Sequence, residues 1–388
     1  MFYMEKIRLG IIGVGNMGNG HFDNIKAGKC PEVTVTAVAD IKPARLEAIK
    51  AKADGELACF DNAEALMDSG LVDAVLIAVP HYDHPTLAIL AMQKGLHVMV
   101  EKPAGVYTKQ VREMNEESEK HNVVFGMMFN QRTNHIYRKM RELIKSEKYG
   151  QIRRVNWLIT DWYRPQAYYD SGDWRATWSG EGGGVLLNQC PHQLDLMQWI
   201  CGMPEKVYAH VSYGKWHDIE VEDDVTAYLT YPNGATGCFI TSTGDACGTN
   251  RFEVQMDKAK LVVENGELKV WEMETAEPEF SRTNTQPFGC PKSERIEIET
   301  DGKNEQHVAV LNAFAGAILR GESLVAGGKE GINGLTLSNA MHLSSWLGRE
   351  IALPLDEELY YEELSKRIAT SRRKDNVKEA VADTANTY

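Results

Sequence analysis

The amino-acid sequence predicts an α/β protein in two parts: a doubly wound parallel sheet, followed by an α+β part with a large open, mostly antiparallel sheet. Apolar strand-like runs alternate with helical patterns over the first 130 residues, which is typical of a parallel sheet covered by helices on both faces. Long β-type runs without intervening helices follow residue 150 and indicate an antiparallel sheet. The 388 residues suffice for two domains, which we expect at residues 1–127 and 128–388.

The first part shows a regular alternation of elements. The expected strands are residues 7–12, 33–40, 57–60, 73–79, 97–100 and 123–129. The expected helices are residues 21–28, 43–53, 61–70, 85–95 and 108–121. Pro43 suits the first turn of its helix, and Asp61 with Glu64 forms a capping-box pattern.

The second part begins with an expected connecting helix over residues 134–150. The expected β-type runs are residues 152–163, 206–216, 223–244, 251–274 and 294–300, with Asn-Gly hairpin turns at 233–234 and 265–266. Two late helices are expected at 304–321 and 333–348, and they could pack back on the first domain. Such a sheet is expected to have one face covered by helices and the other available to a second subunit. Residues 370–388 form a polar tail.

Composition restricts the class of partner. The net charge is −13 and the pI near 5.4, which argues against a nucleic-acid partner because phosphate binding needs a basic face. No apolar run reaches the roughly 18 residues of a membrane span, and the N-terminus lacks a signal-peptide layout. The seven cysteines are odd in number and contain no CxxC pair, so we expect reduced thiols and a cytoplasmic protein.

A glycine-rich turn, "GVGNMG", lies between the first strand and the first helix. It fits G-x-G-x-x-G: Gly13 permits a tight turn, Gly15 lets the backbone approach a pyrophosphate, and Gly18 permits close helix–strand packing. Asp40 ends the next strand, where a carboxylate can accept hydrogen bonds from both ribose hydroxyls. The context predicts a Rossmann dinucleotide-binding domain, although each piece alone could be a tight turn or a surface aspartate.

The same aspartate distinguishes between the two nicotinamide dinucleotides. A carboxylate at Asp40 repels the 2′-phosphate of NADP, so we expect NAD rather than NADP as the cofactor. Lys42 and Arg45 follow closely and are the residues that leave NADP open.

The stretch "HVMVEKPAGV" places two charges, Glu101 and Lys102, at the end of an apolar strand. In a doubly wound sheet, ligands bind beyond the carboxyl ends of the strands. Lys102 is therefore expected where a nicotinamide and its substrate meet, and "VPHYDH" over 79–84 faces the same crevice. Pro103 fixes the turn, and a cis peptide bond before it is one way to aim the lysine. A surface lysine at a strand end is the plain alternative.

These motifs together resemble the glucose–fructose oxidoreductase/inositol dehydrogenase (Gfo/Idh/MocA) family. "FNQR" at 129–132, "DWR" at 173–175, the glycine-rich stretch at 180–204 and "LGREIALP" at 347–354 add to the match, which covers roughly residues 5 to 354. The resemblance implies NAD(P)-dependent oxidation or reduction of sugars, cyclitols or related small molecules. It also implies dimers or tetramers built on the open sheet.

The resemblance assigns roles to particular residues. The catalytic positions fall on Lys102, Asn188 and His192. The expected cofactor-binding residues are Gly13, Gly15, Asn16, Met17, Gly18, Asp40, Pro80, His84, Glu101, Lys102 and Asn130. The expected substrate-binding residues are Lys102, Arg132, Tyr163, Trp174, Arg175, Asn188 and His192.

His192 is the expected general base. A lysine has an ordinary pKa of about 10.4 and would need a perturbation of about 4 kcal/mol to act as a base at neutral pH, whereas histidine starts near 6.5. Lys102 would then donate a hydrogen bond to the reacting oxygen, although the reverse assignment stays open. Asn188 departs from the aspartate of the best-known members, so it would orient the imidazole without a charge. Pro191 starts or kinks the helix here, and Asp195 is interpreted as a structural anchor.

The segment 161–184 supplies aromatic and charged side chains for a substrate. Flat rings suit the C–H face of a pyranose and the interleaved polar groups suit its hydroxyls, although about half of these rings would serve packing alone. The arginines are dispersed, which favours a neutral glucoside, free sugar or cyclitol over a phosphorylated substrate. Oxidation at C3 of a glucosyl unit is the leading specific hypothesis. His81, His84 and Cys190 do not form a compact ligand set, so no metal is expected.

Three other functions compete with a dehydrogenase. An NAD-dependent glycosidase would use transient oxidation and return NAD unchanged, and a non-catalytic NAD-dependent sensor would tolerate loss of Lys102 and His192. Biliverdin reductase-like chemistry shares the fold but fits the glycine-rich region less well. The sequence identifies neither the sugar, the position oxidised, the physiological direction, the oligomer size, nor whether NAD leaves after each turnover.

Overall fold

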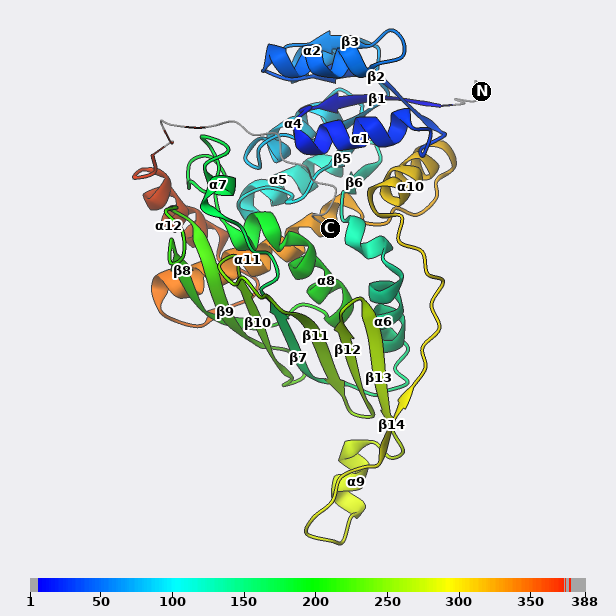
Figure 1. Ribbon diagram of the computed structural model, residues 1–388, viewed down its shortest axis with the longest axis vertical. Coiled ribbons are helices and arrows are strands. Elements are labelled where there is room, and N and C mark those ends of the chain that lie inside the picture. Colours follow the sequence, from blue (N-terminus) through cyan, green and yellow to red (C-terminus); the bar gives the residue numbers. More distant parts are fainter. Residues whose placement is uncertain (1–5, 373, 375–376, 378–388) are drawn as a thin grey trace.

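A computed structural model describes residues 6–372, 374 and 377 and contains two sheets (Figure 1). The first sheet is parallel, with strand order β3-β2-β1-β4-β5-β6. Its strands are β1 (Ile7–Ile12), β2 (Val33–Ala39), β3 (Ala58–Phe60), β4 (Ala74–Ile77), β5 (His97–Val100) and β6 (Phe125–Met127). This is the doubly wound parallel sheet that the alternation predicted, and the fold class is confirmed.

Helices cover both faces of the first sheet because its strands are apolar on both sides. They are α1 (Asn16–Lys26), α2 (Pro43–Lys52), α3 (Ala63–Asp68), α4 (Asp83–Gln93), α5 (Thr108–Ser118) and the late helix α10 (Gln306–Arg320). Phe22 of α1 and Phe314 of α10 share one core cluster with Leu9 and Ile11, while α3, α4 and α5 contribute to the other cluster. The late helix therefore returns to the N-terminal sheet. The division of the chain at residue 128 stays our proposal.

The second sheet has the strand order β14-β13-β12-β11-β7-β10-β9-β8-β15 and is mostly antiparallel. Among the described strands of this sheet, only β7 and β10 pair in parallel. Its strands are β7 (Ile152–Ile159), β8 (Lys206–Tyr213), β9 (Glu222–Thr230), β10 (Thr236–Ser242), β11 (Asn250–Met256), β12 (Ala259–Glu264), β13 (Glu267–Met273), β14 (Ser293–Ile296) and β15 (Ile351–Ala352).

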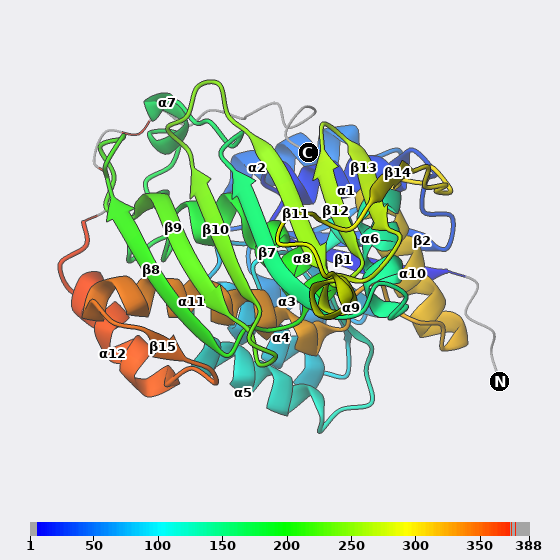
Figure 2. The same ribbon diagram turned by 90° about the horizontal axis from the view of Figure 1, so that it is seen from below.

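Among the described residues, helices cover one face of this sheet and leave the other face uncovered (Figure 2). The covering helices are α6 (His135–Lys145), α8 (Pro191–Cys201) and α11 (Gly331–Leu347). Along β7, Val155, Trp157 and Ile159 are buried in alternation with less buried residues, and the ring of Trp157 stacks on that of Phe252 at 4.1 Å. Tyr228 of β9 is 45% exposed, since the sheet presents alternate side chains to the uncovered face.

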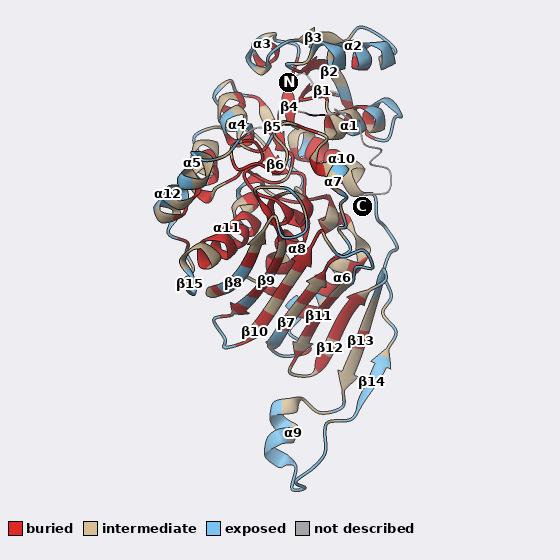
Figure 3. Cartoon of the chain, turned by 60° about the vertical axis from the view of Figure 1, so that its left-hand side comes forward, coloured by how far each residue is buried: buried red, intermediate tan, exposed pale blue. Residues whose placement is uncertain are grey.

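The hairpin between β13 and β14 projects as an arm (Figure 3). The arm, residues 274–292, carries the short helix α9 (Glu277–Thr283), which has no buried residues. Phe288, also in this arm, is 88% exposed.

Two local features differ from the sequence-based expectations. Helix α3 is capped by Asn62, whose side chain accepts from the backbone N–H of Ala65, and not by the Asp61–Glu64 capping box, because the extended residue lies one position later. Helix α12 (Glu357–Ile368) was not predicted; Asp356 caps it. Most of the expected polar tail at 370–388 lies outside the described residues. Over the described residues, no helix is both long and apolar enough to cross a bilayer.

Candidate active site

The turn after β1 contains two glycines whose Cα hydrogens face packed backbone. Gly13 has a φ of +87°, and a Cβ there would lie 2.4 Å from the carbonyl oxygen of Ala78. A Cβ on Gly18 would lie 1.9 Å from the carbonyl oxygen of Gly13, so helix α1 and strand β1 approach too closely for any other residue. Gly15 stands at the start of α1, where backbone N–H groups have no acceptor within the helix.

Asp40 lies beside this turn at the end of β2 and is 6% exposed. Its carboxylate accepts from the backbone N–H of Val14 at 3.0 Å and of Lys42 at 2.9 Å, and Arg45 lies 3.4 Å away. The cradle fits a dinucleotide: the start of α1 would hold the pyrophosphate, and Asp40 would hold the ribose. A bound NAD would supply the nicotinamide ring that accepts or gives the hydride.

Replacing Gly18 by alanine is expected to weaken NADH binding and to lower the free energy of unfolding by about 1–3 kcal/mol, because the added methyl group cannot fit without moving the loop. The matched control is Gly20→Ala, two residues along the same helix, where a Cβ meets nothing within 4 Å. Fluorescence titration with NADH and thermal unfolding measure both effects. Equal NADH affinity in the two variants would contradict the role given to the turn.

Lys102 follows β5, and the Lys102–Pro103 peptide bond is cis. Its Nζ donates a hydrogen bond to the backbone carbonyl oxygen of Asn188 at 3.1 Å, so the lysine bridges the two parts of the chain. Burial lowers the pKa of this ammonium, and the charge of Arg164 acts in the same direction. Glu101 and Glu181 oppose that shift. A lysine with a lowered pKa exchanges its proton more readily than a surface lysine.

Glu101 precedes Lys102 and is held by a buried ion pair. Its Oε1 lies 2.6 Å from Nε2 of His21, a buried residue of α1. Burial opposes ionisation of this carboxyl, but the hydrogen bond and charge of His21 outweigh it and lower the pKa of Glu101 to about 2. His307, at the start of α10, contacts His21 edge-on at 5.3 Å, and burial lowers its pKa to about 4. Glu101 is therefore anionic at neutral pH.

His192 lies in the first turn of α8, directly after Pro191 at the helix start, and is 2% exposed. Its ring contacts Phe129 edge-on at 6.3 Å. Burial lowers the pKa of His192 well below its ordinary value, and the nearby positive charge of Lys102 lowers it further. The imidazole is therefore neutral at pH 7 and able to accept a proton.

Asn188 lies in a π-helical turn, η2 (Val185–Gln189), just before α8. Its side-chain amide donates to Oε1 of Glu181, a fully buried carboxyl that sequence analysis missed. Burial raises the pKa of Glu181, whereas Arg175, 3.6 Å from Oε1, lowers it. The carboxyl group missing at residue 188 is thus supplied by Glu181, one hydrogen bond away. The only sequence signal was an acidic residue inside the glycine run "GEGGG".

Glu181 is expected to position the side chain of Asn188 and to raise the pKa of Lys102. Glu181→Gln removes a negative charge that raises the pKa of Lys102, so that pKa falls further and any alkaline loss of activity moves to lower pH. Loss of one charged hydrogen bond should lower kcat by about 10- to 100-fold. The measurement is the pH profile of kcat/KM for both proteins. A purely structural role would lower activity at every pH without moving the profile.

Two predicted site residues are engaged elsewhere. Arg132, expected to bind substrate, is 2% exposed and forms two hydrogen bonds to Asp195, at 2.8 and 2.7 Å, and an ion pair to Glu330 at 2.6 Å. This arrangement favours an anchoring role for both Arg132 and Asp195. His84, expected to contact cofactor, has its two ring nitrogens 2.7 Å and 2.8 Å from the carbonyl oxygens of Pro103 and Val79, so it ties β4 to the turn after β5.

The other predicted contact residues differ in how far they are buried, and their roles stay predictions. Asn130 donates to Gln306 at 2.5 Å and is fully buried, while Pro80 and Tyr163 are exposed. Trp174 contacts His81 edge-on at 6.2 Å. Asn16 and Met17 form the first turn of α1.

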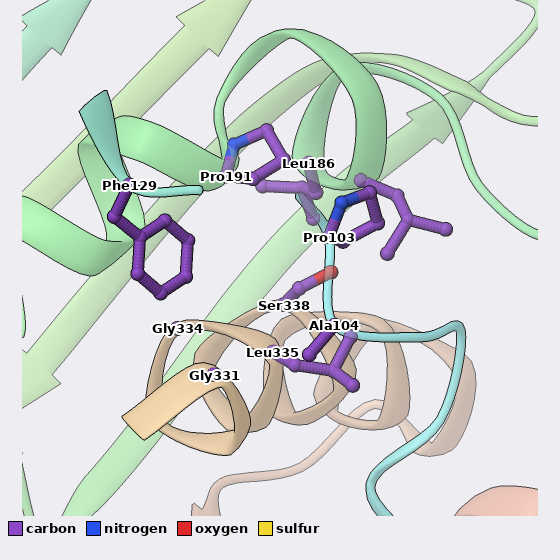
Figure 4. A pocket seen from close by; sticks show the side chains of 10 residues that line it. Pro103, Ala104, Phe129, Leu186, Pro191, Gly331, Gly334, Leu335 and Ser338 are labelled. Carbon is purple, nitrogen blue, oxygen red and sulfur yellow. The ribbon is translucent and has the colours of Figure 1, made fainter. Parts of the chain in front are cut away.

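An apolar cavity of about 10 Å³ lies behind Pro103 (Figure 4). Its walls come from the turn after β5, from η2 and α8, and from α11. The lining residues are Pro103, Ala104, Phe129, Leu186, Leu187, Pro191, Gly331, Gly334, Leu335 and Ser338. A void this small and apolar holds no sugar. It lies among the turn after β5, η2, α8 and α11, and Lys102 is not among its lining residues. No group of three or more His, Cys, Asp or Glu side chains among the described residues could hold a metal ion.

A dinucleotide turn that leads to a partly buried lysine and a neutral imidazole is the arrangement of an NAD-dependent oxidoreductase. Residues 7–129 match the oxidoreductase family with an NAD-binding Rossmann fold, and residues 137–262 match the GFO/IDH/MocA C-terminal domain. The chain belongs to the Gfo/Idh/MocA family of oxidoreductases.

Similar proteins support the same class. A myo-inositol 2-dehydrogenase of Thermotoga maritima is 28% identical over 267 residues, which cover 67% of this chain and 75% of that protein. The WlbA dehydrogenase of Chromobacterium violaceum, solved with NADH and UDP-GlcNAcA, is 27% identical with a TM-score of 0.78 and covers 91% of this chain and 97% of its own. The Bordetella pertussis WlbA dehydrogenase, solved with the same two ligands, is 25% identical with a TM-score of 0.76. The match covers 90% of this chain and 100% of that chain.

Proposed function

We propose that this enzyme oxidises a secondary hydroxyl of a sugar, glycoside or cyclitol with NAD, and that C3 of a glucosyl unit is the leading position. The observation that carries the proposal is a contact between the two parts of the chain: Nζ of Lys102 donates to the backbone carbonyl oxygen of Asn188 at 3.1 Å, which brings Lys102 to the turn just before His192. Both belong to elements that meet at the carboxyl end of β5, where a parallel sheet binds its ligand. The inositol dehydrogenase relative supports a polyol substrate.

The two groups divide the proton chemistry in this proposal. The neutral imidazole of His192 accepts the hydroxyl proton, and Lys102 donates a hydrogen bond to the same oxygen, which stabilises its developing negative charge. Asn188 positions Lys102 through its backbone carbonyl, which already accepts a hydrogen bond from Nζ. His192 is 2% exposed and Lys102 is partly buried, and the low local dielectric strengthens each of these interactions.

A screen of glycosides, free sugars and cyclitols for NADH absorbance, with NMR of each product, tests this function. A stable ketone formed in step with NADH supports the dehydrogenase. Released aglycone without net NADH points to a glycosidase that returns NAD unchanged. NADH binding without turnover of any polyol points to a sensor and would contradict the proposal.

We also propose that a second copy of the chain covers the uncovered face of the sheet. Tyr228 is 45% and Tyr208 37% exposed on neighbouring strands, and the arm at 274–292 projects beyond the sheet with Phe288 exposed. Apolar and aromatic residues gathered on one face are typical of an interface. Sedimentation velocity of the wild type and of Tyr228→Glu tests it. We expect a dimer or tetramer that the charge dissociates, and a monomeric wild type would contradict it.

A further inference from the structure

The segment between β7 and η2 carries a stack in which rings and guanidinium groups alternate. This segment includes the short helix α7 (Gln166–Tyr169) and lies between the two sheets (Figure 1). The guanidinium carbon of Arg164 lies 5.5 Å from the ring centre of Trp162 and 5.2 Å from that of Tyr168. That of Arg175 lies 4.4 Å from the ring of Tyr168 and 4.7 Å from that of Trp174. Each ring therefore holds a cation by its face.

The two arginines differ in their counter-charges. Arg175 lies 3.6 Å from the carboxylate of Glu181 and donates to the hydroxyl of Tyr168 at 2.7 Å. Arg164 forms no ion pair with any carboxylate among the described residues, and its guanidinium donates only to the backbone carbonyl of Tyr163, at 2.9 Å. A guanidinium has five N–H donors, so most of those on Arg164 remain available to a ligand.

The backbone of Arg164 is held from both sides. Its N–H donates to the carbonyl oxygen of Thr243 at 3.0 Å, and its own carbonyl oxygen lies 2.8 Å from Nε2 of His217. Nδ1 of His217 lies 3.0 Å from the buried carboxylate of Asp223, which fixes that ring in turn. Because its backbone is fixed and two rings flank it, the guanidinium loses little conformational freedom when a ligand binds. Such preorganisation favours binding.

The position of Arg164 relates it to the reacting group. Its guanidinium faces the ring of Tyr168 at 5.2 Å, and Nζ of Lys102 donates to the backbone carbonyl oxygen of Asn188 at 3.1 Å. Tyr168 also accepts from Gln189 of η2 at 3.2 Å, directly after Asn188. A ligand group bound at Arg164 would therefore belong to the same molecule whose hydroxyl reaches Lys102.

We propose that Arg164 binds a carboxylate of the substrate, which makes the substrate class acidic sugars or acidic cyclitols, such as uronates and their glycosides. This inference rests on the proposed function, and it replaces the neutral substrates that sequence analysis favoured with acidic ones of the same sugar and cyclitol class. The planar guanidinium fork matches a carboxylate in shape and charge. Arg175, the other cation of the stack, is already paired with Glu181. A phosphate bound here would therefore have only the guanidinium of Arg164 to pair with.

Calorimetric titration of the NADH-loaded protein with matched ligands tests the inference. The probes are D-glucuronate against D-glucose, methyl β-D-glucuronide against methyl β-D-glucoside, and D-glucose 6-phosphate. We expect the carboxylates to bind at least about tenfold more tightly than their neutral partners, the effect of one charged hydrogen bond. Arg164→Met should abolish the difference while NADH affinity stays the same, and Arg164→Lys should retain part of it.

The control variant is Arg282→Met, which removes one positive charge from the exposed arm and should leave every affinity unchanged. Equal affinity for acids and neutral sugars, no binding of any carboxylate, a preference that survives Arg164→Met, or tighter binding of the phosphate would each overturn the inference. NADH formation with the same ligands separates it from the proposed function. If carboxylates bind but are not oxidised, the proposed function is wrong and the inference about Arg164 stands. If neutral sugars are oxidised and acids are not preferred, the inference is wrong and the proposed function stands.

Discussion

Replacing Lys102 by methionine is expected to lower kcat by about 10²- to 10⁴-fold, because the reacting oxygen loses the donor that stabilises its developing charge. NADH affinity should stay within about twofold of the wild type, since the glycine turn and Asp40 are untouched. Single-turnover kinetics at saturating NAD and substrate measure the effect on the chemical step.

Stability should move in the opposite direction from activity in the same variant. Burial lowers the pKa of Lys102, which shows that its surroundings disfavour the charged form. Methionine has a similar length without the charge, so the melting temperature should stay equal or rise. Lys120→Met is the control, because that side chain is 65% exposed and forms a surface ion pair with Glu117. A Lys102→Met protein with normal kcat, or one that has lost NADH binding, would contradict the assignment.

The regular parts of the fold could be predicted because local patterns determine them. Apolar runs bounded by glycine and proline placed all six strands of the first sheet, and the contact that requires Gly18 comes from Gly13 within the same turn. Such patterns do not fix an exact cap residue: Asn62 caps α3 in place of its neighbour Asp61, which has similar hydrogen-bonding chemistry. Helix α12 was missed because its polar sequence, residues 357–368, lacks a strong apolar stripe.

The partners of the site residues could not be predicted because they come from distant positions. His21 meets Glu101 across 80 residues, and Arg132 meets Asp195 across 63. Nothing in the sequence distinguishes an arginine that closes a buried ion pair, such as Arg132, from one that is left without a carboxylate, such as Arg164. That difference depends on the three-dimensional arrangement of the charges, and it reverses which arginine is expected to meet the substrate.

Replacing His192 by asparagine is expected to lower kcat by about 10²- to 10⁴-fold, because the hydroxyl proton loses its acceptor. The pH profile makes this assignment specific. A base is active when deprotonated, so wild-type kcat/KM should fall only as pH drops through the pKa of His192, which burial and Lys102 place well below about 6.5. Lys102 donates in its protonated form, so activity should fall again as pH rises through a pKa lowered from 10.5.

The two limbs of this profile identify the base. In His192→Asn the acid limb should disappear while the alkaline limb remains. In Lys102→Met the alkaline limb should disappear, and the acid limb should move to higher pH because the imidazole no longer faces a positive charge. If Lys102 is the base instead, activity in both the wild type and His192→Asn would rise through the lysine pKa and stay high at alkaline pH. Steady-state rates from pH 5 to pH 10 on the three proteins therefore decide which group takes the proton.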